Sequence, residues 1–193
     1  YTPKDKQTYD EQFNNRTGFH TTVNGIYNTM TGSALYGSNL SYGAIDIMGL
    51  CYKITNSSTS KYELCTAAYT GTYASGTISS IWSTAYNALL NINVLLQALD
   101  EKPDVLLPED ATMIRGEMLA ARAMLHLDLV RIFGPVYIVN PDGLTVPYAD
   151  APEIIKRERM PLGDIIYNKI IPDLTEAQNL LKDCDPILTE GVL

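Results

Sequence analysis

Apolar residues recur every three or four positions along several stretches, a spacing that places side chains on one face of a helix. The clearest stretch ends at Gly134 and Pro135, and its apolar face comprises Ile114, Met118, Ala121, Leu125, Leu129 and Ile132. Glu109 and Asp110 lie near its start and Arg131 lies in its last turn, charges that suit the helix dipole. Gly134 is expected to end this helix with a positive φ, and Pro135 cannot continue it.

Three further stretches show the same spacing and predict helices over residues 17–30, 82–99 and 162–181. Their apolar faces comprise Phe19, Val23, Ile26 and Met30; Trp82, Ala85, Leu89, Ile92, Leu96 and Leu99; and Leu162, Ile166, Ile170, Leu174, Ala177 and Leu181. We expect Trp82 to belong to the core. Pro172 lies inside the last stretch and predicts a kink, because proline lacks the N–H that the helix needs.

Other segments give weaker patterns. Residues 36–50 predict a second helix, although two glycines weaken it by about 1 kcal/mol each. Residues 6–13 predict a short helix or turn. Residues 54–80 are rich in Ser, Thr, Gly and Tyr without a helical period, so a long loop is expected there. Residues 140–159 contain several prolines and predict a second loop.

These elements predict an all-α fold built from tetratricopeptide-like helical pairs with long irregular loops. Residues 1–193 are expected to form one helical-repeat domain or a fragment of a larger protein. The last predicted helix has no further helix after it to pack against. We therefore expect its apolar face to be covered by a segment that this sequence lacks.

Composition narrows the function classes. A net charge of −8 argues against nucleic-acid binding, which needs clustered lysine and arginine. No apolar run reaches the roughly 20 residues that span a bilayer. The three cysteines favour free thiols, with a disulfide between Cys51 and Cys65 as the alternative. The chain begins with Tyr1 rather than Met, which suggests processing or trimming.

The residues expected of a catalytic or metal site are scarce. There are two histidines, no nucleophile or phosphate-binding motif, and no Cys-x-x-Cys spacing. We therefore predict no catalytic residue, no metal and no cofactor. His126 is interpreted as a helix histidine with its hydrogen bonds satisfied. Glu117, Arg122 and Asn93 are interpreted as polar anchors between helices.

Three motifs, taken in order, resemble the SusD/RagB family. The stretch GEMLAARAMLHLDLVRIFGPV over residues 116–136 is similar to the signature helix of that family. The pattern of Trp82, Tyr86, Leu89, Ile92 and Asn93 is similar to a helix that precedes it. The third motif begins at Arg159 and Pro161 and continues through Ile166, Tyr167, Ile170, Asp173, Leu174 and Ala177.

The resemblance implies a non-catalytic, SusD-like surface lipoprotein of a Gram-negative bacterium. Such a protein captures oligosaccharides at the outer membrane and passes them to a SusC-like TonB-dependent transporter. Its lipid anchor would be an N-terminal cysteine upstream of this chain, and the C-terminal part of the family is absent here. The alternative is a helical-repeat scaffold that binds proteins and has no carbohydrate ligand.

The candidate binding residues lie in the predicted loop over residues 54–80. Sugar rings present apolar C–H faces and hydroxyls, so they need aromatic rings with amide or hydroxyl partners. This loop offers Asn56, Tyr62, Tyr69 and Tyr73, and residues 64–99 carry no charge. In the family the corresponding region helps to form the glycan site. We therefore predict ligand contacts from these four residues.

Overall fold

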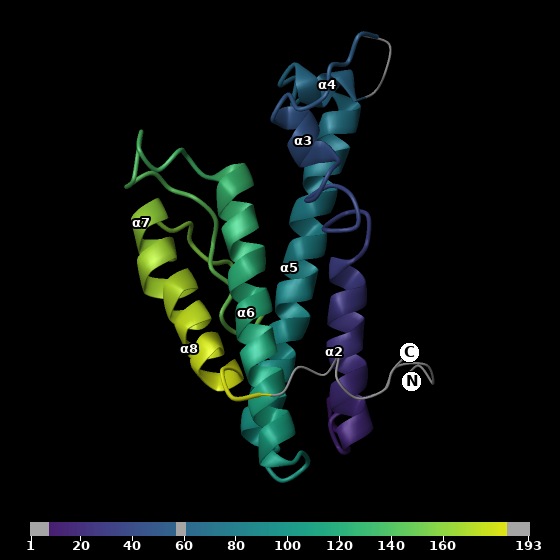
Figure 1. Cartoon of the computed structure of the whole chain (residues 1–193), viewed down its shortest axis with the longest axis vertical. Coiled ribbons are helices and arrows are strands. Elements are labelled where there is room, and N and C mark those ends of the chain that lie inside the picture. The colour runs from purple at the N-terminus through teal and green to yellow at the C-terminus, as the bar shows by residue number, and fades with distance from the viewer. Residues whose placement is uncertain (1–7, 57–60, 185–193) are drawn as a thin grey trace. The chain divides into compact units, whose positions relative to one another are not determined.

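The computed structural model describes residues 8–56 and 61–184, and within them every regular element is a helix (Figure 1). The predicted all-α class is confirmed. An isolated bridge joins Leu144 to Pro161 in the segment before α7. The elements are α1 (Tyr9–Gln12), α2 (Arg16–Met30), α3 (Ala44–Met48), α4 (Tyr62–Cys65), α5 (Thr72–Glu101), α6 (Pro108–Phe133), α7 (Leu162–Ile165), the π-helical η1 (Ile166–Ile170) and α8 (Ile171–Leu181).

The chain divides into two compact units. Unit 1 comprises residues 1–23 and 91–193, and unit 2 comprises residues 24–90. The boundaries fall inside α2 and α5, so each of these helices contributes one end to each unit. The predicted short element within residues 6–13 is α1, whose Thr8 and Glu11 form a reciprocal capping box. Its first two predicted residues, 6 and 7, lie outside the described residues.

In unit 1, α6 begins eight residues before Gly116 and ends where the sequence predicts. The N–H of Gly134 donates to the carbonyl oxygen of Val130 at 2.8 Å. The expected positive φ is wrong, because Gly134 is extended with φ −95° and ψ 168°. A Cβ at this position would lie 2.6 Å from the Val130 oxygen and 3.0 Å from Cγ2 of Thr145. Close approach, rather than left-handed backbone, is what requires the glycine.

The expectation that the last helix lacks a partner is also wrong, because α8 packs along α6 (Figure 1). The two helices meet at Gly116, where a Cβ would lie 2.6 Å from Cγ of Leu181. Pro172 lies in the first turn of α8, directly after η1. Proline cannot donate a helix hydrogen bond, and its ring crowds a carbonyl of the preceding turn. The π-helical turn η1 accommodates both effects, so the helix is irregular at Pro172 through a π-helical turn.

In unit 2, the predicted helix over residues 36–50 is wrong except for the five residues of α3. The preceding segment folds as consecutive turns, with hydrogen bonds such as Gly37 N–H to Gly32 O at 3.0 Å and Ile45 N–H to Asn39 O at 3.0 Å. A Cβ at Gly37 would lie 2.2 Å from the Thr31 oxygen. The glycines are therefore required by tight turns.

The predicted loop over residues 54–80 is wrong in its second half. It contains α4 and the first nine residues of α5, while residues 57–60 lie outside the described residues. Trp82, expected in the core, is 36% exposed on α5. The start of α5 was not predicted because it is rich in serine, threonine and glycine, which have low helix propensity. Tertiary packing overrides that propensity in the folded chain.

Candidate functional site

The polar residues of α6 hold unit 1 together. Nε and Nη2 of Arg122 donate to the two carboxylate oxygens of Asp173 on α8 at 2.7 and 2.8 Å. Nη1 of Arg122 donates to Oδ1 of Asn93 on α5 at 2.9 Å, and Nδ2 of Asn93 donates to the Ala149 carbonyl at 2.9 Å. Arg122 and Asn93 are thus structural anchors, as predicted.

His126 is buried in the same cluster and is held neutral. The Ala149 N–H donates to its Nε2 at 3.0 Å, so Nδ1 carries the proton and donates to the Arg122 carbonyl oxygen at 2.8 Å. Its ring stacks on that of Tyr148 at 3.9 Å. Burial lowers the pKa of His126 to about 4. Because both ring nitrogens are bonded, the predicted structural role is confirmed.

The described residues contain neither a metal-binding cluster nor a disulfide. In residues 8–56 and 61–184 no group of three or more His, Cys, Asp or Glu side chains is arranged to hold a metal ion. Cys51, Cys65 and Cys184 are free thiols, so the alternative disulfide between the first two is absent. Within the same residues, no helix combines the length and apolar character needed to cross a bilayer.

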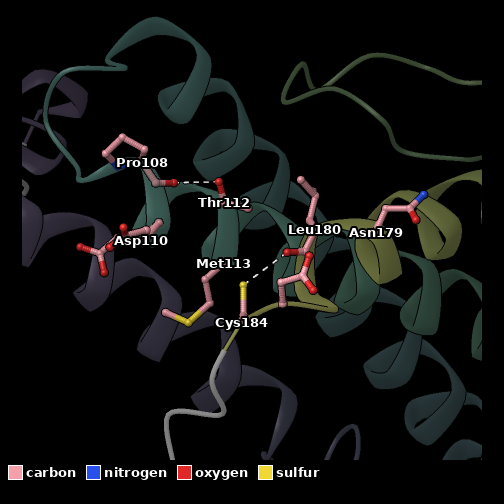
Figure 2. A pocket seen from close by; sticks show the side chains of 9 residues that line it. Pro108, Asp110, Thr112, Met113, Asn179, Leu180 and Cys184 are labelled. Carbon is pink, nitrogen blue, oxygen red and sulfur yellow. Dashed lines mark hydrogen bonds between the residues drawn. The ribbon is translucent and has the colours of Figure 1, made fainter.

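Two hollows among the described residues of unit 1 are both lined by charged groups. The larger, about 660 Å³, lies between the start of α6 and the end of α8 (Figure 2). It is lined by Glu109, Asp110 and Asp183, without an aromatic ring, and is bordered by Cys184, the last described residue. The other, about 420 Å³, surrounds the Arg122 cluster. Neither combines rings with neutral polar groups.

Unit 2 contains a hollow of a different character, which we call the neutral hollow. Its volume is about 410 Å³, within the range of small-molecule sites. One wall is the turn segment before α3 and the other is the first turns of α5. Its lining has no charged side chain and comprises Ser33, Ala34, Ser38, Asn39, Thr72, Tyr73, Gly76, Thr77 and Ser80.

The start of α5 is fixed by α4. Leu64 is buried and anchors α4, and Ala67 turns the chain with a positive φ of 56°. Oε2 of Glu63 then accepts a hydrogen bond from the Ala74 N–H at 2.9 Å, in the first turn of α5. A Cβ at Gly71 would lie 2.3 Å from Oε2 of Glu63, so only glycine admits this cap. The cap positions Tyr73 at the hollow.

The opposite wall is fixed by backbone hydrogen bonds within the turns. Leu35 is fully buried beneath them. The Ser38 carbonyl oxygen accepts from the N–H groups of Tyr42 and Gly43 at 3.1 and 2.8 Å. The Asn39 N–H donates to the Ser33 oxygen at 3.1 Å. These bonds hold the Ser33, Ser38 and Asn39 side chains at the hollow independently of any ligand.

The lining can exchange hydrogen bonds with a polyhydroxyl ligand. The side chains of Asn39, Thr77 and Ser80 make no hydrogen bond to another described residue. Tyr73 is half-buried and supplies an aromatic ring. No heavy atom lies within 4 Å of where a Cβ of Gly76 would stand, so this glycine leaves the hollow open. No lining group is an acid, a base or a strong nucleophile.

The structure places one of the four predicted site residues at the neutral hollow and the other three outside its lining. Tyr73 lines the neutral hollow, whereas Asn56, Tyr62 and Tyr69 are not among its lining residues. Asn56 and Tyr69 are exposed, and Tyr62 lies half-buried on α4. The sequence interpretation did not include Ser38 and Asn39, because it assigned residues 36–50 to a helix, and it made no assignment for Ser33. The uncharged run over residues 17–45 is a sequence signal that could have indicated this wall.

Comparison with known proteins places this fold in a family. Residues 4–187 match the SusD-like family, described as starch-binding and associating with the outer membrane. A SusD superfamily protein from Bacteroides thetaiotaomicron superposes with a TM-score of 0.66 at 20% identity. A putative sugar binding protein from Bacteroides vulgatus superposes with a TM-score of 0.62 at 27% identity.

Each of these two superpositions covers 86% of this chain and 37% of the other, so the chain spans little more than a third of their length. Curated proteins give no match. The family match extends over nearly the whole chain, and the helices that carry the three motifs are those that form the Arg122 cluster and the wall of the neutral hollow. The chain therefore belongs to the SusD-like family.

Proposed function

We propose that this chain captures an oligosaccharide without chemically changing it, and that the neutral hollow of unit 2 makes the contact. The observation that carries the proposal is the hollow's combination of a tyrosine ring with neutral hydroxyl and amide groups, in a chain of the SusD-like family. The similar structure from Bacteroides vulgatus is itself named a putative sugar binding protein.

The physical basis of capture is the match between a sugar ring and this lining. The C–H face of the ring packs on Tyr73, an aromatic contact worth about 0.5–1.5 kcal/mol. Asn39, Thr77 and Ser80 then exchange hydrogen bonds with the sugar hydroxyls. Hydrolysis would require a pair of carboxyl groups at the bond, and the hollow lining has none. This composition supports binding without turnover.

The cellular setting is part of the same proposal. The chain acts at the surface of the outer membrane, anchored through a lipidated cysteine upstream, and delivers its ligand to a SusC-like TonB-dependent transporter. An exposed apolar run in unit 1 supports the proposal of a protein partner. The run comprises Val136, Ile138 and Val139, and Ile138 is 93% exposed. Exposed apolar runs of this kind favour protein contacts.

A glycan array followed by calorimetry tests the ligand. We expect at least one oligosaccharide to bind and to be recovered intact. Tyr73→Ala should weaken its affinity by about 0.5–1.5 kcal/mol, the value of one aromatic contact. Tyr69→Ala, which removes an exposed tyrosine outside the hollow, is the matched control. No binding on the array, or release of shortened sugars, would contradict the proposal.

Copurification with the transporter tests the partner. Ile138→Asp should abolish copurification because it places a charge in the apolar run. Leu107→Asp, at an exposed apolar residue before α6, should leave copurification unchanged. Equal effects of the two substitutions would show that the run is not the contact surface.

A further inference from the structure

Unit 2 carries no net charge although the whole chain is strongly acidic. Residues 24–90 contain two acidic and two basic residues, which are Asp46, Glu63, Lys53 and Lys61. None of these four lines the neutral hollow. The net charge of −8 is therefore carried by residues outside unit 2.

Both walls of the hollow come from uncharged sequence. The turn segment lies in the run over residues 17–45, and the start of α5 lies in the run over residues 64–99; neither run contains Asp, Glu, Lys or Arg. Because the lining comes entirely from these two runs, the hollow supplies hydroxyl and amide groups but no ammonium or guanidinium group.

An anionic sugar would find no favourable charge at the start of α5. A helix N-terminus attracts anions through its free N–H groups and dipole. Here the carboxylate of Glu63 already accepts the Ala74 N–H at 2.9 Å. A second carboxylate or a sulfate would lose water, meet no cation and lie close to an existing negative charge.

We infer that the neutral hollow selects uncharged oligosaccharides and rejects those that carry carboxylate or sulfate groups, an inference that rests on the proposed glycan-binding function. Neutral sugars need only the hydroxyl, amide and aromatic partners that the lining offers. The acidic remainder of the chain adds long-range repulsion for polyanions. Two effects therefore disfavour an anionic sugar. The hollow lining has no cationic side chain to pair with it, and the negative charge of the rest of the chain repels it.

The test compares neutral oligosaccharides with their acidic counterparts by calorimetry. Galacto-oligosaccharides are paired with galacturono-oligosaccharides, and gluco-oligosaccharides with their sulfated forms. A third pair is the neutral array ligand that binds most tightly and its sulfated derivative. We expect the neutral member of a binding pair to bind at least about tenfold more tightly. Its Kd should change less than about twofold between about 0.1 M and about 1 M salt, because no ion pair forms.

Charge introduced into the hollow gives a second readout. Thr77→Lys should raise affinity for the acidic counterparts severalfold, whereas Thr29→Lys, on α2 outside the lining, should not. Equal gains from both variants would place the selection outside the hollow and overturn the inference. An acidic ligand that binds as tightly as its neutral partner would overturn it while the proposed function stands. Absence of binding to every glycan would overturn both.

Discussion

At the scale of single residues, Arg122 of α6 links unit 1's helices α5 and α8 through hydrogen bonds to Asn93 and Asp173. Its guanidinium pairs with both oxygens of Asp173, and each side chain is 12% exposed. Removing one partner of such a pair leaves a buried charge without compensation. The cluster that results joins α5, α6 and α8, so we expect it to fix these helices rather than to contact a ligand.

Arg122→Ala is expected to lower the free energy of unfolding by about 3–5 kcal/mol, the cost of breaking a buried pair. Arg115→Ala is the control, because its partner Asp100 is largely exposed and the pair is worth at most about 1 kcal/mol. Urea unfolding measures both. Where Arg122→Ala remains folded, it should bind glycan as wild type does. Wild-type stability with lost binding would contradict the structural role.

His126 makes stability depend on pH. Its pKa is about 4 in the folded chain, and an unfolded histidine has a pKa near 6.5. The unfolded state therefore binds more protons between these values, so stability is complete above pH 6.5 and falls as pH drops towards 4. We expect a loss on the order of 3 kcal/mol over that window.

The measurement is the free energy of unfolding in urea at several pH values across that window. His126→Gln keeps a donor and an acceptor but does not titrate, so its stability should fall less steeply. Carboxylates titrate equally in both proteins, and the difference between the two slopes isolates His126. Parallel slopes would show that this histidine is not held neutral.

The structural roles of these residues could be predicted from sequence, because each is a polar side chain in an otherwise apolar helix. Such a side chain must be bonded when buried, which identifies Arg122, Asn93 and His126. Their partners could not be predicted, because Ala149 and Asp173 are remote in sequence and only the folded loop and α8 bring them near.

At the scale of elements, close contacts decide where glycine is required. Gly116→Ala should destabilise the chain by about 1–3 kcal/mol, because the new methyl group meets Leu181 where α8 packs on α6. Gly25→Ala lies on a helix with no heavy atom near the new Cβ and should stabilise by up to about 1 kcal/mol. Thermal unfolding that shifts both variants in the same direction would contradict the packing of α6 against α8.

The long helices could be predicted from sequence, and the turns could not. The apolar period fixes most of α2, α5, α6 and the last helix, because burial of one face dominates their formation. The segment before α3 shows the same period over a few residues, yet close approach at Gly37 and Gly43 imposes turns. That misassignment hid one wall of the neutral hollow, and only Tyr73 of the four predicted contacts lines it.

At the scale of the whole molecule, charge and chemistry are separated between the units. Unit 1 carries the net negative charge, the Arg122 cluster and the exposed apolar run, whereas unit 2 contains the neutral hollow. We propose that the protein docks through unit 1 and captures an uncharged ligand through unit 2. In this proposal, capture occurs at the neutral hollow.

Calorimetry with the tightest array ligand on Gly76→Leu and Gly25→Leu tests whether capture occurs there. Both glycines lie on helices of unit 2 with open space at Cβ, so both variants should be as stable as wild type or more so. Gly76→Leu fills the hollow and should weaken binding at least about tenfold, whereas Gly25→Leu should bind as wild type does. Unchanged affinity in a folded Gly76→Leu protein would contradict the account.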